Sequence, residues 1–187
     1  LNLAAGTVVG DPAFSGTDSL SSIEAIRGTH LADTYNAIGF FGSFGTLNEF
    51  EGMAGDDTVI GNGNTRIAFY SAREAVSVDL AAGTVAGGPS VGTDTLVGGV
   101  REVRGSNFDD TIAGSLGDDF LAGGNGNDLL RGGAGFDFLD GGLGSDRFDF
   151  DSPADGVDTI SFFEAFPGGD VLDIGELLLN WTSYNGG

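Results

Sequence analysis

Aspartates recur at every ninth residue between positions 105 and 149. Each is sixth in a unit that opens with Gly, and the units are GSNFDDTIA (105–113), GSLGDDFLA (114–122), GGNGNDLLR (123–131), GGAGFDFLD (132–140) and GGLGSDRFD (141–149). The sixth-place residues are Asp110, Asp119, Asp128, Asp137 and Asp146. Carboxylates in glycine-rich turns without His or Cys offer only oxygen ligands, which suit Ca²⁺ better than Zn²⁺ or a transition metal.

Related units occur earlier in the chain. GMAGDDTVI (52–60) carries Asp57, and a degraded copy, GTHLADTYN (28–36), carries Asp33. A longer period is also present, because LAAGTVVGDPAFSGTDSL from Leu3 returns as LAAGTVAGGPSVGTDTL from Leu80. Internal repeats of this kind indicate a repetitive architecture with a duplicated unit.

Each nonapeptide predicts a turn followed by a short strand. Its first six residues have the composition of a tight turn, and its last three alternate around one apolar residue. The apolar eighth-place residues, which we expect to point inward, are Ile112, Leu121, Leu130, Leu139 and Phe148. Two nonapeptides then make one coil of a solenoid with two parallel sheets, and stacked turns place an Asp and several carbonyls of neighbouring coils together. We expect the ion to bridge coils there.

The overall composition agrees with a bound cation. The chain has 187 residues, 35 of them Gly, a formal net charge of −21 and no Cys. Such a charge repels a nucleic acid or another polyphosphate, yet a hydrophobic content of 40% is too high for permanent disorder. We therefore expect cations to neutralise the carboxylates. The absence of Cys excludes a disulfide framework and thiolate zinc sites.

The two ends of the sequence suggest a piece of a longer protein. No apolar stretch approaches the length of a membrane span, and the opening LNLAAGTVVG lacks the basic start of a secretory signal. Since the chain begins and ends abruptly, we expect a fragment whose parent protein has further regions.

Five contiguous copies of G-G-x-G-x-D-x-U-x, where U is apolar, resemble the RTX family of secreted bacterial proteins, also called haemolysin-type. The resemblance implies a right-handed parallel β-roll with Ca²⁺ held between turns. It also implies that the sixth-place carboxylates bind the ions together with backbone carbonyls of the turns. Ser106 and Ser115 replace the second Gly of the first two units, and Phe108 replaces a fourth-place Gly, so the turn containing Asp110 matches the pattern least.

The resemblance transfers metal binding to specific positions. The predicted carboxylate ligands are the five sixth-place Asp residues of 105–149 and Asp57. The predicted turn positions that help to hold the ions are Gly123, Gly124, Asn125, Gly126, Asn127, Gly132, Gly133, Gly135, Gly141, Gly142 and Gly144.

The tail from 145 to 178 resembles the C-terminal region of type I secreted proteins. Its elements are an aromatic-Asp strand, the sequence DGVDTI from Asp155, and DVLD from Asp170. Phe162, Phe163 and Phe166 arrive together after the repeats end, and a solenoid needs a cap over its exposed edge. We predict an aromatic C-terminal cap and a secretion-associated region that stops early.

Folding should depend on the ion. One inward residue per nonapeptide is a thin core, and apolar burial at roughly 25 cal/mol per Å² cannot easily offset backbone ordering of more than about 1 kcal/mol per residue. The chain is therefore predicted to stay loose in a calcium-poor cytosol and to fold outside a bacterial cell, in the medium or on the cell surface. Type I secretion is the expected export route.

Seventh-place side chains should face outward, and Phe120 and Phe138 lie one coil apart. A neighbouring segment, such as the Phe-rich stretch 38–50, would cover them. The alternative is a surface for self-association or for a neighbouring domain.

Other constellations have ordinary explanations. His30 is the single His and fits a surface turn, and no H-E-x-x-H motif signals a metalloprotease. Adjacent Asp pairs fit metal binding better than glycosidase chemistry. Arginines at positions 66, 73, 101 and 104 could line a groove for an acidic polysaccharide, although surface pairing with Asp and Glu is commoner.

The sequence thus predicts an all-β protein: an irregular β-solenoid over 1–104 with two related LAAGTV units, a β-roll over 105–149 and a cap over 150–187. Its predicted function is a calcium-binding structural module of an exported bacterial protein, without catalysis of its own, in a surface, adhesive or assembly role. The alternatives are a secretion or stability tail of an extracellular enzyme and a polysaccharide-binding or polysaccharide-modifying module.

Overall fold

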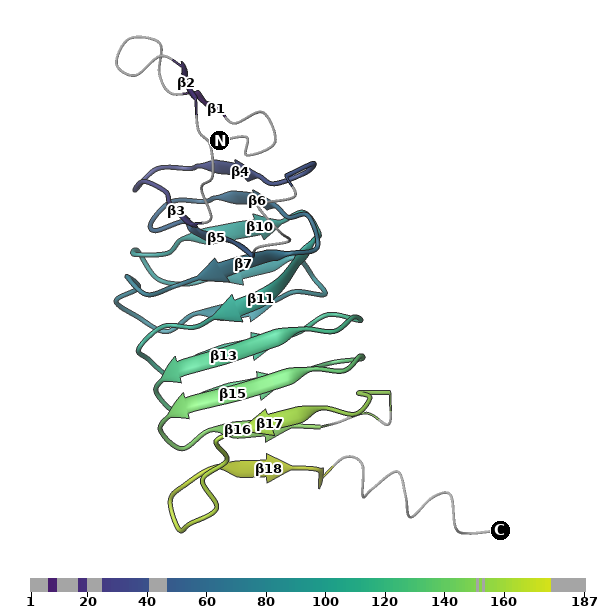
Figure 1. Cartoon of the computed structure of the whole chain (residues 1–187). Helices are drawn as coiled ribbons and strands as arrows, with labels where there is room; N and C mark the ends of the chain where they lie inside the picture. Colours follow the sequence, from purple (N-terminus) through teal and green to yellow (C-terminus); the bar gives the residue numbers. More distant parts are fainter. Residues whose placement is uncertain are drawn as a thin grey trace.

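The computed structural model describes residues 7–9, 17–19, 25–40, 47–150, 152 and 154–175. Short strands stack into two sheets that face each other along a solenoid, with β3 and β4 near one end and β17 and β18 at the other (Figure 1). The predicted parallel β-roll is confirmed. Among the residues described, no helix has the length and apolarity needed to cross a membrane.

One sheet has seven strands and the other nine. The seven-stranded sheet has, in spatial order, β17 (Thr159–Ser161), β15 (Phe138–Leu143), β13 (Phe120–Asn125), β11 (Val100–Arg104), β7 (Thr65–Ala68), β5 (Asn48–Glu51) and β3 (Ala25–Arg27). The nine-stranded sheet has β18 (Val171–Asp173), β16 (Arg147–Asp149), β14 (Leu129–Arg131), β12 (Thr111–Ala113), β8 (Ser77–Asp79), β9 (Thr84–Ala86), β10 (Thr93–Leu96), β6 (Thr58–Ile60) and β4 (Thr34–Asn36).

The register confirms that two nonapeptides form one coil. Within the repeats, parallel neighbours are 18 residues apart, as in Thr111 beside Leu129 and Phe120 beside Phe138. Successive nonapeptides therefore alternate between the two sheets, and each turn lies directly above the turn of the next coil.

The core is a single file of apolar side chains between the sheets. All five eighth-place residues, Ile112, Leu121, Leu130, Leu139 and Phe148, are fully buried. The file continues through Val103, Val78, Val59 and Tyr35 toward the other end. The inward direction expected for the eighth place is thus confirmed.

One strand, β9, interrupts the parallel order of the nine-stranded sheet. β9 pairs antiparallel with both β8 and β10, so this part of the nine-stranded sheet is a meander. The duplicated LAAGTV units form matching antiparallel pairs: Val85 lies beside Asp94 in β9 and β10, and Val8 lies beside Asp18 in β1 (Thr7–Val9) and β2 (Thr17–Ser19).

Two strands continue the sheets at the C-terminal end of the described residues. β17 and β18 continue the two sheets beyond β15 and β16. Of the three phenylalanines expected in the cap, Phe163 contacts Phe148, with ring centroids 6.0 Å apart. Phe162 and Phe166 are 81% and 58% exposed. Within the described residues, two added strands therefore extend the sheets at this end, and one ring of the predicted aromatic cap contacts the core.

Candidate metal centre

The sixth-place aspartates lie at the corners of the solenoid, each directly before a strand. Asp110, Asp128 and Asp146 precede β12, β14 and β16, whereas Asp119 and Asp137 precede β13 and β15 on the other side. Their side chains are at most 4% exposed. The fold therefore gathers the predicted ligands into two columns and buries carboxylates that ordinarily stay in water.

A hydrogen bond joins each aspartate to the one in the next coil. The backbone N–H of one Asp donates to the Oδ1 atom of the next, and this leaves Oδ2 for another partner. With the donor first, the pairs are Asp33 and Asp57 (2.7 Å), Asp57 and Asp94 (2.9 Å), Asp110 and Asp128 (2.7 Å), Asp119 and Asp137 (2.8 Å), Asp128 and Asp146 (2.9 Å), Asp137 and Asp158 (3.0 Å), and Asp146 and Asp170 (2.9 Å).

Five of these carboxylates have a buried Oδ2 atom that no donor among the described residues reaches. They belong to Asp57, Asp128, Asp137, Asp146 and Asp158. Buried oxygens of charged groups are costly unless a hydrogen bond or a cation satisfies them. The same unsatisfied atom at successive corners is therefore what a set of cation sites requires.

The first-place glycines keep the space beside these oxygens open. A Cβ atom at Gly123 would collide with Asp128 Oδ2 and would lie 2.7 Å from the carbonyl oxygen of Gly141, in the next coil. Similarly, Gly132 and Gly141 have their own sixth-place carboxylates next to the missing Cβ. At the Gly123 corner a carboxylate and a carbonyl thus border one space, and both are ligands that Ca²⁺ prefers.

The second- and fourth-place glycines bring neighbouring turns into backbone contact. Gly124, Gly133 and Gly142 have positive φ, and so do Gly126, Gly135 and Gly144. A Cβ atom on any of them would collide with a carbonyl group one coil earlier, for example that of Ser106 at Gly124. Larger residues would force the turns apart, which explains the repeated glycines.

The two asparagines predicted at the site use their side chains between turns. Asn125 Nδ2 donates to Asn107 Oδ1 at 2.5 Å, and Asn127 Oδ1 accepts from the N–H of Ser145 at 2.9 Å. No group of three or more His, Cys, Asp and Glu side chains that could hold a metal occurs in the described part of the chain. Backbone carbonyls must therefore complete any site here, and the predicted carbonyl ligands stay predictions.

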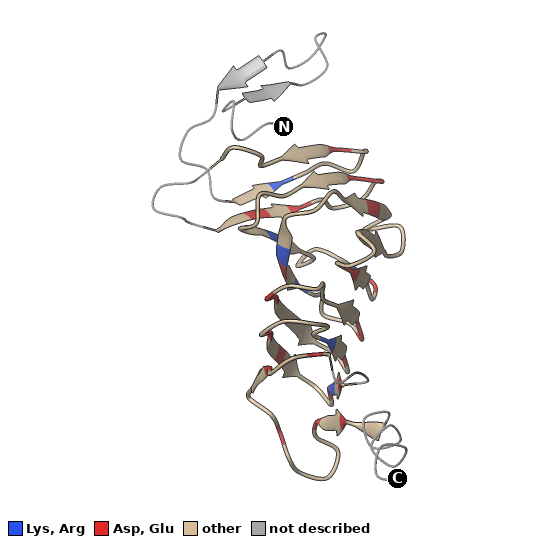
Figure 2. Ribbon diagram, turned by 90° about the vertical axis from the view of Figure 1, so that its right-hand side faces the viewer, with Lys and Arg blue, Asp and Glu red and all other residues tan. Residues whose placement is uncertain are grey.

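Stacking acidic corners perturbs their ionisation. Burial, followed by the nearby charges of Asp110 and Asp146, raises the pKa of Asp128 to about 7 even though a backbone N–H lowers it. Burial likewise raises the pKa of Asp94 to about 7 and those of Asp57 and Asp137 to about 6. Acidic residues recur from coil to coil along the stack, while basic residues are few (Figure 2). A divalent cation would remove this repulsion.

Three aspartates of the columns were not predicted as ligands. Asp94, Asp158 and Asp170 take the same place as the sixth-place residues, each with an Oδ1 that accepts the N–H of the preceding Asp. The nine-residue spacing is broken before each of them. The local pattern persists, because all three begin an Asp-x-apolar tripeptide: DTL, DTI and DVL.

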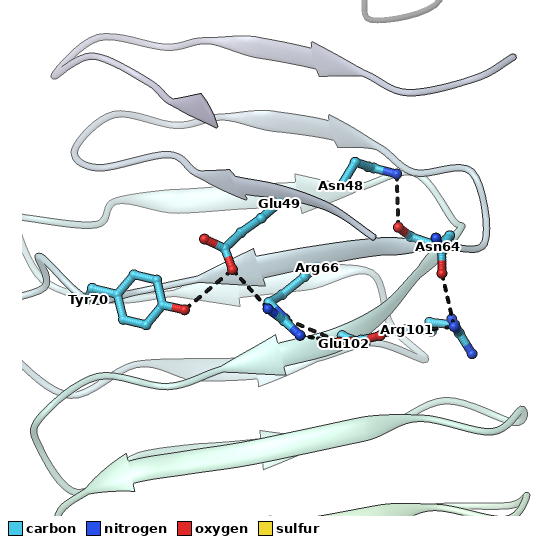
Figure 3. Close-up of polar contacts among 7 residues, drawn as sticks. All are labelled: Asn48, Glu49, Asn64, Arg66, Tyr70, Arg101 and Glu102. Atoms are coloured by element: carbon cyan, nitrogen blue, oxygen red, sulfur yellow. Dashed lines mark hydrogen bonds and ion pairs between the residues drawn. The ribbon is translucent and has the colours of Figure 1, made fainter. Parts of the chain in front are cut away.

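Three of the four arginines considered for a polysaccharide groove, Arg66, Arg101 and Arg104, lie in different surroundings. Arg66 lies between Glu49 at 3.1 Å and Glu102 at 2.7 Å on the outer face, and Arg101 donates to Asn64 (Figure 3). Arg104 borders a groove of about 310 Å³ together with Tyr70 and Phe120. Arg66 and Arg101 are therefore engaged within the fold, and Arg104 is the arginine that a groove ligand would meet.

Phe120 and Phe138 stack on the outer face of the seven-stranded sheet. Their ring centroids are 4.7 Å apart and the ring planes differ by 11°. The stretch 38–50 was expected to cover them. Residues 41–46 lie outside the described residues, and Phe50 of this stretch is buried in the core between the sheets. Cover by this stretch stays a prediction.

Comparison with known proteins identifies the repeats. A family model described as RTX calcium-binding nonapeptide repeat (4 copies) matches residues 48–65, 104–139 and 123–152. No curated protein matches the chain. The matched ranges contain Asp57 and all five predicted sixth-place ligands.

Proposed function

The chain belongs to the RTX calcium-binding proteins, and on that premise we propose that Ca²⁺ orders its solenoid after export from the cell. Repeats of this family form a structural calcium-binding module that is typical of exported bacterial proteins. The finer proposal is that ion binding and chain folding are one event, which occurs where calcium is abundant.

The observation that carries this proposal is the set of buried Oδ2 atoms without a donor at successive corners. Asp128, Asp137 and Asp146 would hold ions between coils of the matched repeats, with Asp57 doing so near the other end. The ion would supply positive charge between carboxylates whose pKa values are raised by burial and mutual repulsion. The chain's own part is to orient the carboxylates through the Oδ1 hydrogen bonds.

A calcium titration of the full chain tests the proposal. At about pH 8, where these carboxyls are ionised, the calcium-free protein should show weak β circular dichroism that rises as isothermal titration calorimetry records binding. Magnesium is the control, because its stricter octahedral geometry and tight hydration disfavour such carbonyl-rich corners. Full β signal in EGTA, or no heat with calcium, would contradict the proposal.

We also infer an assembly or adhesive role through the outer face. The stacked rings of Phe120 and Phe138 and the adjoining groove at Arg104 support a contact with a second copy or a neighbouring domain. Size-exclusion chromatography with and without calcium tests assembly, and the double variant Phe120→Ser and Phe138→Ser should weaken it. If the wild type and the double variant elute at the same volume at all calcium concentrations, the proposed assembly role of this face is wrong.

The alternatives are tested separately. A polysaccharide-binding role is supported by the groove beside Arg104 and Phe120, and a glycan array with and without calcium would reveal it. Type I secretion, and a role as the tail of an extracellular enzyme, are supported by the sequence resemblance of 145–178. Export of a passenger fused before residues 105–187 through a type I exporter tests that proposal, and retention in the cell would contradict it.

A further inference from the structure

Seven turns share Gly at the first place and Asp at the sixth, yet they have two conformations. Three carry a hydroxyl residue at the second place: Thr29, Ser106 and Ser115. The other four carry Met53, Gly124, Gly133 and Gly142 there. We call the first kind closed turns and the second kind open turns.

In a closed turn a backbone N–H of the same turn satisfies the Oδ2 atom of the carboxylate, whereas Oδ1 of Asp119 has no hydrogen-bond partner among the described residues. The second-place N–H donates to the Oδ2 atom of the sixth-place Asp at 2.6 Å from Thr29, 2.5 Å from Ser106 and 2.5 Å from Ser115. The hydroxyl of the same residue accepts the N–H of the fourth-place residue, at 3.1, 3.1 and 3.2 Å respectively. The Oδ2 atom that a cation would need is thus already bonded.

In an open turn the second-place residue has positive φ, which is 72° at Met53, 116° at Gly124, 90° at Gly133 and 97° at Gly142. The sixth-place Oδ2 atom then has no hydrogen-bond partner within the described chain. All four of these aspartates, Asp57, Asp128, Asp137 and Asp146, are at most 3% exposed. Each open turn therefore presents a buried oxygen that lacks a donor.

The hydroxyl, rather than glycine content, separates the two kinds. Gly117 is a fourth-place glycine like Gly135, but in the turn of Ser115 it does not take the positive φ of 139° that Gly135 has. Conversely, Met53 has a side chain and no hydroxyl, and its turn is open with a φ of 72°. A serine or threonine that bonds to a nearby backbone N–H is a known competitor of other turn conformations.

We propose that a second-place hydroxyl closes a turn against calcium, so that this chain binds ions at its open turns and not at Thr29, Ser106 or Ser115. This inference rests on the proposed calcium binding and deepens it. The N–H on Oδ2 occupies one lone pair of that oxygen and directs its positive end toward the space that a cation would enter. A closed turn therefore needs no ion at its Oδ2 atom, whereas an open turn does.

Ser115→Gly is the most direct test, because its turn already has Gly117 at the fourth place. The corner beside Gly114 also holds the required oxygens: a Cβ there would collide with the Gly132 carbonyl and would lie 2.9 Å from Asp119 Oδ2. In the full chain we expect Ser115→Gly to bind one Ca²⁺ more than the wild type. Ser115→Thr, which keeps the hydroxyl as at Thr29, should bind the same number as the wild type. Native mass spectrometry and calorimetry give these counts.

Gly133→Ser in the next coil is the reverse change and should lose one Ca²⁺. If that variant fails to fold, the comparison of Ser115→Gly with Ser115→Thr decides alone. Equal calcium counts in the wild type, Ser115→Gly and Ser115→Thr would overturn the inference while leaving the proposed function intact. A wild type that binds no calcium would overturn the proposed function, and the inference with it.

Discussion

Replacing Asp128 with Asn should have opposite effects on stability without and with calcium. Asn keeps an oxygen that can accept the Asp110 N–H, now at 2.7 Å, but removes a charge that is 1% exposed. Without calcium the lost charge relieves repulsion from neighbouring carboxylates. With calcium the same change removes a ligand.

The magnitude follows from the pKa. A rise from the ordinary 3.8 to about 7 corresponds to about 4 kcal/mol for the ionised group. Half of this energy, about 2 kcal/mol, already corresponds to a factor of roughly 30, so we expect Asp128→Asn to favour the calcium-free fold at least roughly 30-fold at about pH 8. In about 1 mM Ca²⁺, a lost site with a Kd near 10⁻⁴ M should cost roughly 1.4 kcal/mol.

The assay is circular dichroism in EGTA, with enough trimethylamine N-oxide to fold part of the protein, followed by denaturant unfolding at saturating calcium. Asp118→Asn is the matched control, because Asp118 is an exposed Asp whose Oδ1 also accepts a backbone N–H one coil away, from Phe136 at 2.9 Å. The control should change little in either condition. If Asp128→Asn lowers the β signal in EGTA, the electrostatic reasoning is wrong.

Three further predictions follow from the same geometry. In EGTA, the β circular dichroism signal should rise as pH falls from about 8 to about 5, because the corner carboxyls, with pKa values up to about 7, bind more protons in the folded than in the unfolded chain. A signal that does not change with pH would contradict this. Gly123→Ala should weaken calcium binding at least tenfold, because its Cβ would fill the corner. Gly117→Ala should not, because the nearest atom to its added Cβ is a side-chain oxygen 4.0 Å away. Equal calcium affinities of the two variants in calorimetry would refute this prediction. Arg66→Met should destabilise the fold by about 1–2 kcal/mol in urea, because Glu49 and Glu102 lose their shared cation, and replacing both with Gln should restore most of the loss.

The regular part of the fold could be predicted from the sequence because each nonapeptide repeats the same pattern of a turn followed by a short strand with one apolar residue. An apolar residue at every eighth place, such as Leu130 or Leu139, has one way to reach the core, and the intervening turn fixes the 18-residue coil. The sixth-place Asp then lies at a corner, because it comes two residues before the buried eighth-place residue and directly before the strand. Strict periodicity thus determined the coil, the core and the corner positions of the predicted ligands.

Positions where the period breaks could not be predicted in the same way. Asp158 and Asp170 follow longer loops, and Asp94 lies in β10, within the antiparallel meander of β8 to β10, so counting by nine does not reach them. Their Asp-x-apolar tripeptides were the remaining signal. The serines at 106 and 115 were recognised as departures, but their hydrogen bonds to Oδ2 depend on turn geometry that composition does not encode.

The central claim is that calcium occupancy and order of the coils are the same event. Hydrogen exchange of the full chain, measured while calcium is titrated into EGTA-treated protein, tests it most directly because it reports backbone protection in the repeats. We expect the amides of β12 to β16 to gain protection together, at the calcium concentration at which binding is recorded. Full protection of these strands in EGTA, or binding without any gain in protection, would contradict it.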